Sequence, residues 1–207
     1  MLAALAVSAA LLAVPGFASG QEIHLEGVTS FTGTGSASLL SAEKEPTFTC
    51  ESTDVEGVVA AGGTTGTMAL DITGCHSTLF GFTVKCHTSG SPLDNTVKTG
   101  GVLHLVTYNS KPAVLATSEV VTLVCAGISS VTISGDSIAT ITSPNCGQES
   151  NKLALSFAAS GGLQEDRLYT GVEHNLKLKT SEGSQVNAAT TQTWSISSPT
   201  KGKLNCT

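Results

Sequence analysis

Two Cys-His pairs in the segment 74–87, GCHSTLFGFTVKCH, are the residues of this chain best suited to bind a metal. Cysteine and histidine are the usual ligands of structural zinc, and a c-type haem is attached through Cys-x-x-Cys-His. The cysteines lie too far apart in the sequence for either spacing. On a strand, Cys86 and His87 would also point to opposite faces and could not share one ion. We therefore expect no metal site and no cofactor, and we expect the cysteines to form disulfides.

The even number of cysteines is typical of a disulfide framework in an exported protein. A bridge between Cys75 and Cys86 would close a loop of about a dozen residues, which stabilises a fold by roughly 3 kcal/mol. The pattern that we rank first combines this bridge with two others. Its three pairs are Cys75–Cys86, Cys50–Cys125 and Cys146–Cys206.

A predicted hairpin around Gly62-Gly63 gives a different pair. In its register Cys50 lies opposite Cys75, which would allow a cross-strand bridge. The same register places Asp54 against Asp71 on one face, and like charges directly opposite each other destabilise a sheet. We therefore rank this pattern second.

The segment 131–142, VTISGDSIATIT, places Gly135-Asp136 between two strand-like arms and predicts a tight β-hairpin. Its register sets Cys125 opposite Cys146, which makes a further rival bridge. The same Gly-Asp-Ser resembles the nucleophile block of the SGNH hydrolases, and that resemblance implies Ser137 as the nucleophile. The chain lacks the Gly-x-Asn-Asp and Asp-x-x-His motifs that accompany the block in that family. We expect Ser137 to be a structural surface residue on the second arm of the hairpin.

The first 18 residues have the layout of a signal peptide. They contain no charged side chain. An apolar core runs from Leu2 to Val14, and a break at Pro15-Gly16 follows it. We expect cleavage after Ala18 and secretion of residues 19–207 as one β domain, with attachment to the cell surface left open. Because no Lys or Arg precedes the apolar core, we also expect that the true start codon lies upstream.

The formal net charge of −6 and the isoelectric point near 5.3 give no basic surface for nucleic acid. No second apolar run is long enough for membrane insertion. The sequence leaves the partner unknown, and self-association stays open.

The composition indicates an all-β protein, because Gly, Ser and Thr dominate and short runs of Val, Ile, Leu and Thr recur. About twelve short strands at this spacing predict a β-sandwich or a partly closed antiparallel barrel, held by disulfides. Only residues 39–44 and 162–168 have helical character. The predicted strands cover residues 23–31, 47–51, 55–60, 67–73, 80–87, 101–108, 120–125, 129–134, 137–142, 152–158, 175–180 and 191–196.

Several cysteine-containing segments resemble those of a group of uncharacterised secreted proteins from actinobacteria, rich in Gly, Ser and Thr. The segments are FTCES (48–52), MALDITGC (68–75), VKCHTSG (84–90), LVC (123–125), ITSPNCG (141–147) and the closing LNCT. The resemblance implies an extracytoplasmic, multi-cysteine β protein and carries no assigned activity. A fainter similarity to chaperone-usher pilin subunits lacks their alternating C-terminal donor motif.

These observations together predict a secreted, non-catalytic structural or binding component of the cell exterior. Trp194 alternates with Ile196 and is expected in the core rather than on a sugar-binding surface. Two alternatives remain: a secreted hydrolase that uses Ser137, and a barrel that encloses a small apolar ligand.

The disulfide interpretation predicts that the purified protein has no free thiol and no stoichiometric zinc. The test is thiol titration under denaturing conditions combined with metal analysis. Two or more free thiols with one zinc per chain would contradict it.

Overall fold

The computed structural model describes residues 23–36, 38–42, 47–79, 82–90, 95–126, 130–160, 163–165, 168–169, 172–181 and 183–206. These residues form strands and their connections, without a helix among them. Within this part of the chain, therefore, no helix could cross a membrane. The predicted signal peptide, residues 1–18, lies outside the described residues.

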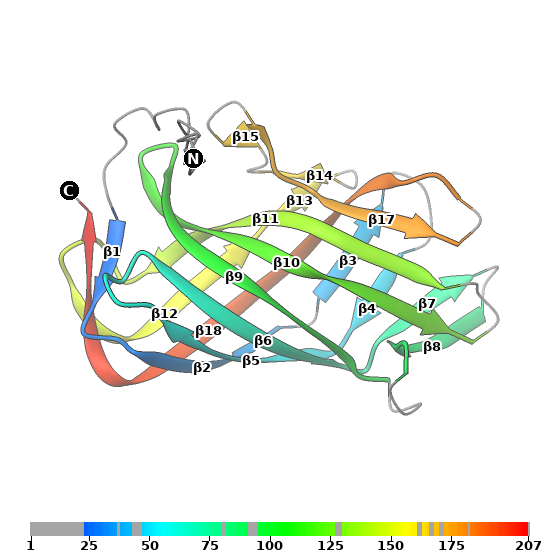
Figure 1. The fold of residues 1–207 in the computed structure, drawn as a ribbon, viewed down its shortest axis with the longest axis horizontal. Helices are drawn as coiled ribbons and strands as arrows, with labels where there is room; N and C mark the ends of the chain where they lie inside the picture. Colours follow the sequence, from blue (N-terminus) through cyan, green and yellow to red (C-terminus); the bar gives the residue numbers. More distant parts are fainter. Residues whose placement is uncertain are drawn as a thin grey trace, which may run out of the picture.

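The strands follow one another along the chain with short connections (Figure 1). Several of them are much longer than the sequence predicted. Their bounds are β1 (Ile23–Glu26), β2 (Ser30–Gly35), β3 (Ser38–Ala42), β4 (Phe48–Cys50), β5 (Ser52–Val59), β6 (Thr65–Thr73), β7 (His76–Leu79), β8 (Phe82–Thr88), β9 (Val97–Tyr108), β10 (Lys111–Cys125), β11 (Val131–Ser143), β12 (Glu149–Phe157), β13 (Ala159–Ser160), β14 (Leu163–Gln164), β15 (Leu168–Tyr169), β16 (Val172–Glu173), β17 (Leu176–Thr180) and β18 (Val186–Cys206).

One large antiparallel sheet folds back on itself because its longest strands pair with several neighbours. Strand β18 pairs with β17 and β3 near its start, with β12 and β2 in its middle, and with β1 at its end. Strand β11 pairs with β10, β12 and β17. The result is a flattened, partly closed antiparallel barrel (Figure 1). This confirms the predicted all-β fold.

The core lies inside this barrel because side chains alternate along each strand. In β18, Trp194 and Ile196 are buried, whereas Thr193, Ser195 and Ser197 between and beside them are exposed. Trp194 is 3% exposed, which confirms its predicted place in the core. Two groups of buried side chains fill the interior, one around Phe31, Trp194 and Ile196 and the other around Cys86, Cys125 and Leu123.

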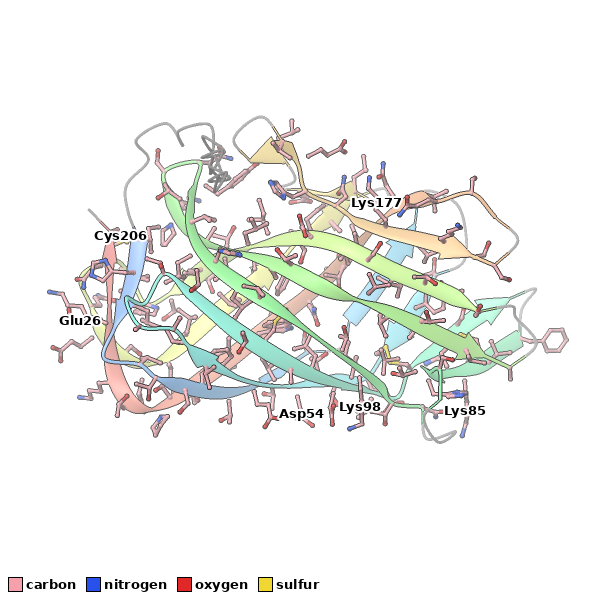
Figure 2. All side chains as sticks on the ribbon, in the orientation of Figure 1. Glu26, Asp54, Lys85, Lys98, Lys177 and Cys206 are labelled. Atoms are coloured by element: carbon pink, nitrogen blue, oxygen red, sulfur yellow. A yellow bond between two sulfur atoms is a disulfide. The ribbon has the colours of Figure 1, made fainter. Side chains whose placement is uncertain are left out.

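The predicted hairpin around Gly62-Gly63 is present as β5 and β6, in the expected register. Asp54 does lie opposite Asp71, as predicted. Lys98 on β9 pairs with Asp71 and its Nζ lies 2.7 Å from the carboxylate, with Asp54 and Lys98 on the outer surface (Figure 2). The ammonium group offsets the repulsion between the two carboxylates, so the like-charge contact does not exclude this register.

The disulfides correct two of the three pairs that we ranked first. Cys50 bonds to Cys75 and Cys86 bonds to Cys125, whereas Cys146–Cys206 is as predicted. The rival pair Cys125–Cys146 is also wrong. The Cys86 N–H donates to the Cys75 carbonyl at 2.9 Å, so these two residues are backbone neighbours although their sulfurs bond elsewhere. The spacing along the chain thus predicted that Cys75 and Cys86 lie close together, but not which cysteine each of them bonds to.

The predicted hairpin at Gly135-Asp136 is wrong, because β11 runs through both residues without a turn. Gly135 pairs with Ser118 of β10 on one side and Leu176 of β17 on the other. Its φ is +103°, and a Cβ there would overlap the carbonyl oxygen of Asn175. The glycine therefore allows close approach of β17 rather than chain reversal.

Neither predicted helical segment is helical where it is described. Residues 39–42 belong to β3, which pairs with β4 and β18, and residues 43–44 lie outside the described residues. In the segment 162–168, residues 163–164 form β14 and residue 168 begins β15. Pairing with distant strands overrides a weak local helical preference.

Gly57 on β5 provides a test of the packing of β5 against its neighbouring strands β2 and β6. A Cβ at this position would overlap the Phe31 ring and the Thr67 carbonyl oxygen. We expect Gly57→Ala to lower the free energy of unfolding by about 1–3 kcal/mol, as overpacking does. Urea denaturation measures it. The neighbouring exposed Val58→Ala is the control, with an expected change within about 0.5 kcal/mol, and equal stability of the two variants would contradict this packing.

Candidate functional site

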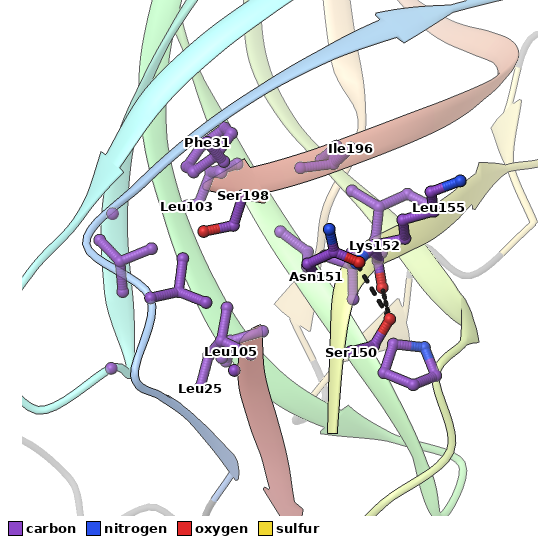
Figure 3. Close-up of a pocket in the computed structure, with 18 of the residues that line it drawn as sticks. Leu25, Phe31, Leu103, Leu105, Ser150, Asn151, Lys152, Leu155, Ile196 and Ser198 are labelled. Carbon is purple, nitrogen blue, oxygen red and sulfur yellow. Dashed lines mark hydrogen bonds between the residues drawn. The ribbon is translucent and has the colours of Figure 1, made fainter. Parts of the chain in front are cut away.

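An apolar cavity of about 70 Å³ lies at the end of the barrel where β1, β9, β12 and β18 meet (Figure 3). On a comparable scale one water molecule needs only roughly 10–15 Å³, so the cavity is larger than a single water site. Most of its wall is aliphatic or aromatic. The wall includes Leu25, Phe31, Leu103, Leu105, Val114, Leu153, Leu155 and Ile196.

The cavity lies beside a break in the pairing of β12 with β18. Ser150 pairs with Gly202, but Lys152 pairs with Ser197. Asn151 alone therefore spans the distance covered on β18 by residues 198–201. This mismatch is an extended bulge, a feature that bends a strand and redirects its side chains. It separates the two strands locally and leaves space inside the wall.

Hydrogen bonds fix the bulge on both strands. On β12 the Ser150 hydroxyl donates to the Lys152 carbonyl at 2.8 Å and accepts from the Lys152 N–H at 2.9 Å (Figure 3). On β18 the Thr200 hydroxyl donates to the Gly27 carbonyl at 2.7 Å. Asn151 and Ser198, next to these bonds along β12 and β18, line this side of the cavity.

Strand β1 and the β5–β6 turn form the opposite wall. The Leu25 N–H donates to the Gly63 carbonyl at 2.9 Å, and both residues line the cavity. The cavity is therefore lined mainly by apolar side chains, with a few polar residues on both sides, Asn151 and Ser198 on one and Thr64 and Thr65 on the other. This lining suits a small, mainly apolar molecule.

A second cavity of about 110 Å³ lies deeper in the barrel and shares no lining residue with the first. The two are neighbours along the strands, because Val114, Leu155 and Ile196 line the first whereas Ala116, Phe157 and Trp194, two positions away, line the second. Mainly apolar side chains form its wall, together with the polar residues Thr99, Ser137, Thr190 and Gln192.

Ser137 lines this inner cavity and is 4% exposed, so the expectation of a surface position is wrong. The neighbouring Asp136 points to the outer side of β11. There its carboxylate lies 3.3 Å from Nδ1 of His174. Among the described residues, no histidine or carboxylate lines the inner cavity around Ser137. Ser137, His174 and Asp136 therefore do not form a catalytic triad.

The cysteines of the two Cys-His pairs, which suggested a metal site, form disulfides and so are not thiolate ligands. Cys75 and Cys86 are in different disulfides. His76 Nδ1 lies 3.1 Å from the Gly74 carbonyl, and His87 is buried. Among the described residues, no group of three or more His, Cys, Asp or Glu side chains is arranged to hold a metal.

In comparisons with known proteins, no family model, no curated protein and no solved structure matches this chain. The resemblance to secreted actinobacterial proteins therefore stays a prediction.

Sequence reasoning missed both cavities. For the end cavity a signal was present, because Pro199 and Gly202 lie just beyond the last predicted strand. Proline cannot donate a ladder hydrogen bond and occurs within sheets mainly at edges and bulges. For the inner cavity no local signal exists, since its wall combines residues from distant strands.

The separation of Ser137 from His174 gives a prediction. Ser137→Ala should change the free energy of unfolding by less than about 1.5 kcal/mol, since one hydroxyl is removed. Ser137→Ala and His174→Gln should both hydrolyse p-nitrophenyl acetate at the background rate of the unaltered protein. An esterase activity that both substitutions abolish would contradict the geometry.

Proposed function

We propose that this protein is an exported, non-catalytic binding component of the cell exterior that holds a small apolar molecule in the end cavity. The observation that carries the proposal is the apolar space beside the β12–β18 bulge, with the polar groups of Asn151 and Ser198 on one side. The mouths of β-barrels are among the preferred places for ligand sites.

Binding accounts for the unfilled space better than a purely structural role does. Space left inside a core costs stability in proportion to its volume, so a barrel that served only as a scaffold would gain from larger side chains there. Bulges next to sites are likewise features that redirect side chains rather than defects. The Ser150 hydrogen bonds that keep the bulge open are consistent with this role.

Three intramolecular disulfides are compatible with a location outside the cytoplasm, where such bonds persist. Together with the signal-like first 18 residues they support secretion. We also propose that neither nucleic acid nor membrane insertion is involved.

Two adjacent valines of β5 provide a matched test. Val59 lines the end cavity, whereas Val58 points outward and is 53% exposed. We expect Val59→Phe to fill part of the cavity and weaken binding of the small probe 1-propanol at least about tenfold, whereas Val58→Phe leaves it unchanged. Methyl chemical shifts of Leu103 and Leu153 during a propanol titration measure the affinity.

Thermal unfolding of both variants controls for loss of structure. If propanol shifts no methyl resonance of the end cavity, or if Val58→Phe and Val59→Phe weaken binding equally, the proposal is wrong.

A further inference from the structure

The only tryptophan of the chain carries a buried hydrogen-bond donor for which the described residues provide no acceptor. Trp194 is 3% exposed and lines the inner cavity, and within the described ranges its indole Nε1 has no hydrogen-bond partner. A buried tryptophan N–H usually finds an acceptor, because leaving the donor unpaired costs free energy. The inner cavity is the space from which such an acceptor could reach it.

The indole ring is held firmly in place. Strand β18 lies between β12 and β2 at this point, with Trp194 paired to Leu155 on one side and Gly35 on the other. Its ring packs against Phe157, with centroids 4.8 Å apart and planes tilted by 55°. The Nε1 edge of the ring lies over Gly35, where a side chain would overlap it, so Phe157 and β2 together confine the ring.

A second polar atom of the same wall is also unsatisfied. The hydroxyl of Thr99 on β9 is buried, has no hydrogen-bond partner and lines the inner cavity. The nearby Gln192 is already engaged, since its Oε1 accepts from the Thr53 hydroxyl at 3.4 Å. Trp194 and Thr99 belong to strands that are not paired with each other, line the same mainly apolar space, and each carry a buried polar atom without a partner among the described residues.

We propose that the inner cavity is a second binding site, for a compact uncharged molecule with an apolar body and one hydrogen-bond acceptor such as a carbonyl oxygen. The Trp194 N–H donates to that oxygen, and the Thr99 hydroxyl is positioned as a further polar contact. A charged ligand is disfavoured because none of the described residues that line the cavity is charged.

The volume limits the size of the molecule. A dry apolar cavity of about 150 Å³ in another protein accepts benzene, so about 110 Å³ suits a ring of five or six heavy atoms at most. This second site is independent of the end cavity, with which it has no residue in common.

The indole resonance tests the proposal directly, because a single tryptophan gives a single indole N–H peak in a ¹⁵N-correlation spectrum. Two probes of nearly equal shape are titrated, cyclopentanone and methylenecyclopentane. We expect cyclopentanone to move the indole proton downfield in a saturable way and to bind about tenfold more tightly than the hydrocarbon, which has no acceptor.

The variant Trp194→Phe keeps an aromatic ring against Phe157 and removes the donor. In this variant the preference for the ketone should disappear, as measured by the methyl shifts of Leu70 and Val97 in the same cavity. Thermal unfolding shows whether the variant is folded, and Thr99→Val provides a second measurement if it is not, with an expected loss of ketone affinity.

The control Val59→Phe fills the end cavity and should leave the cyclopentanone shift intact, so failure of the two proposals can be told apart. An indole peak that does not respond to cyclopentanone and shows only a contact with water would overturn the inner site, as water alone would then satisfy the donor. Equal affinity of the two probes for the unaltered protein would overturn it as well.

Discussion

Backbone hydrogen bonding along β18 is the interaction on which the rest of the structure depends. This strand borders β17 and β3 in its first half, β12 and β2 in its middle, and β1 at its end. Because its inward residues alternate with outward hydroxyl residues, the same strand also supplies the centre of the core. Both cavities lie against it, and the place where its pairing with β12 is interrupted is the place where the end cavity opens.

The fold class could be predicted because it rests on composition and alternation, which are local properties. The β5–β6 register could also be predicted, down to the opposition of Asp54 and Asp71. The conclusion that the two carboxylates disfavour this register was wrong, because Lys98 on β9 supplies a compensating positive charge. No local pattern revealed that β9 lies beside β6. The sulfur partners of Cys75 and Cys86 depend on the same long-range arrangement.

Gly135 shows the converse difficulty. A glycine followed by aspartate is the usual sign of a tight turn, and both neighbouring arms had strand character. The glycine is instead required by β17, which approaches so closely that no side chain fits. Because β11 does not turn at Gly135, Ser137 faces the interior and Asp136 the outside. The structure therefore gives no counterpart to the nucleophile block that the Gly-Asp-Ser sequence resembles. Sequence alone could not separate these two uses of glycine, because the strand that decides between them begins about forty residues later.

The pairing of β1 with the end of β18 has a consequence for when the protein can fold. Ile23 lies opposite Cys206, and Cys146–Cys206 fastens the same region. Distant pairings of this kind form slowly, since the chain must lose much of its freedom before it gains the contacts. The β5–β6 and β9–β10 pairs, in contrast, join strands that are close along the chain. We therefore expect the barrel to close at β1 and β18 only after these local hairpins have formed.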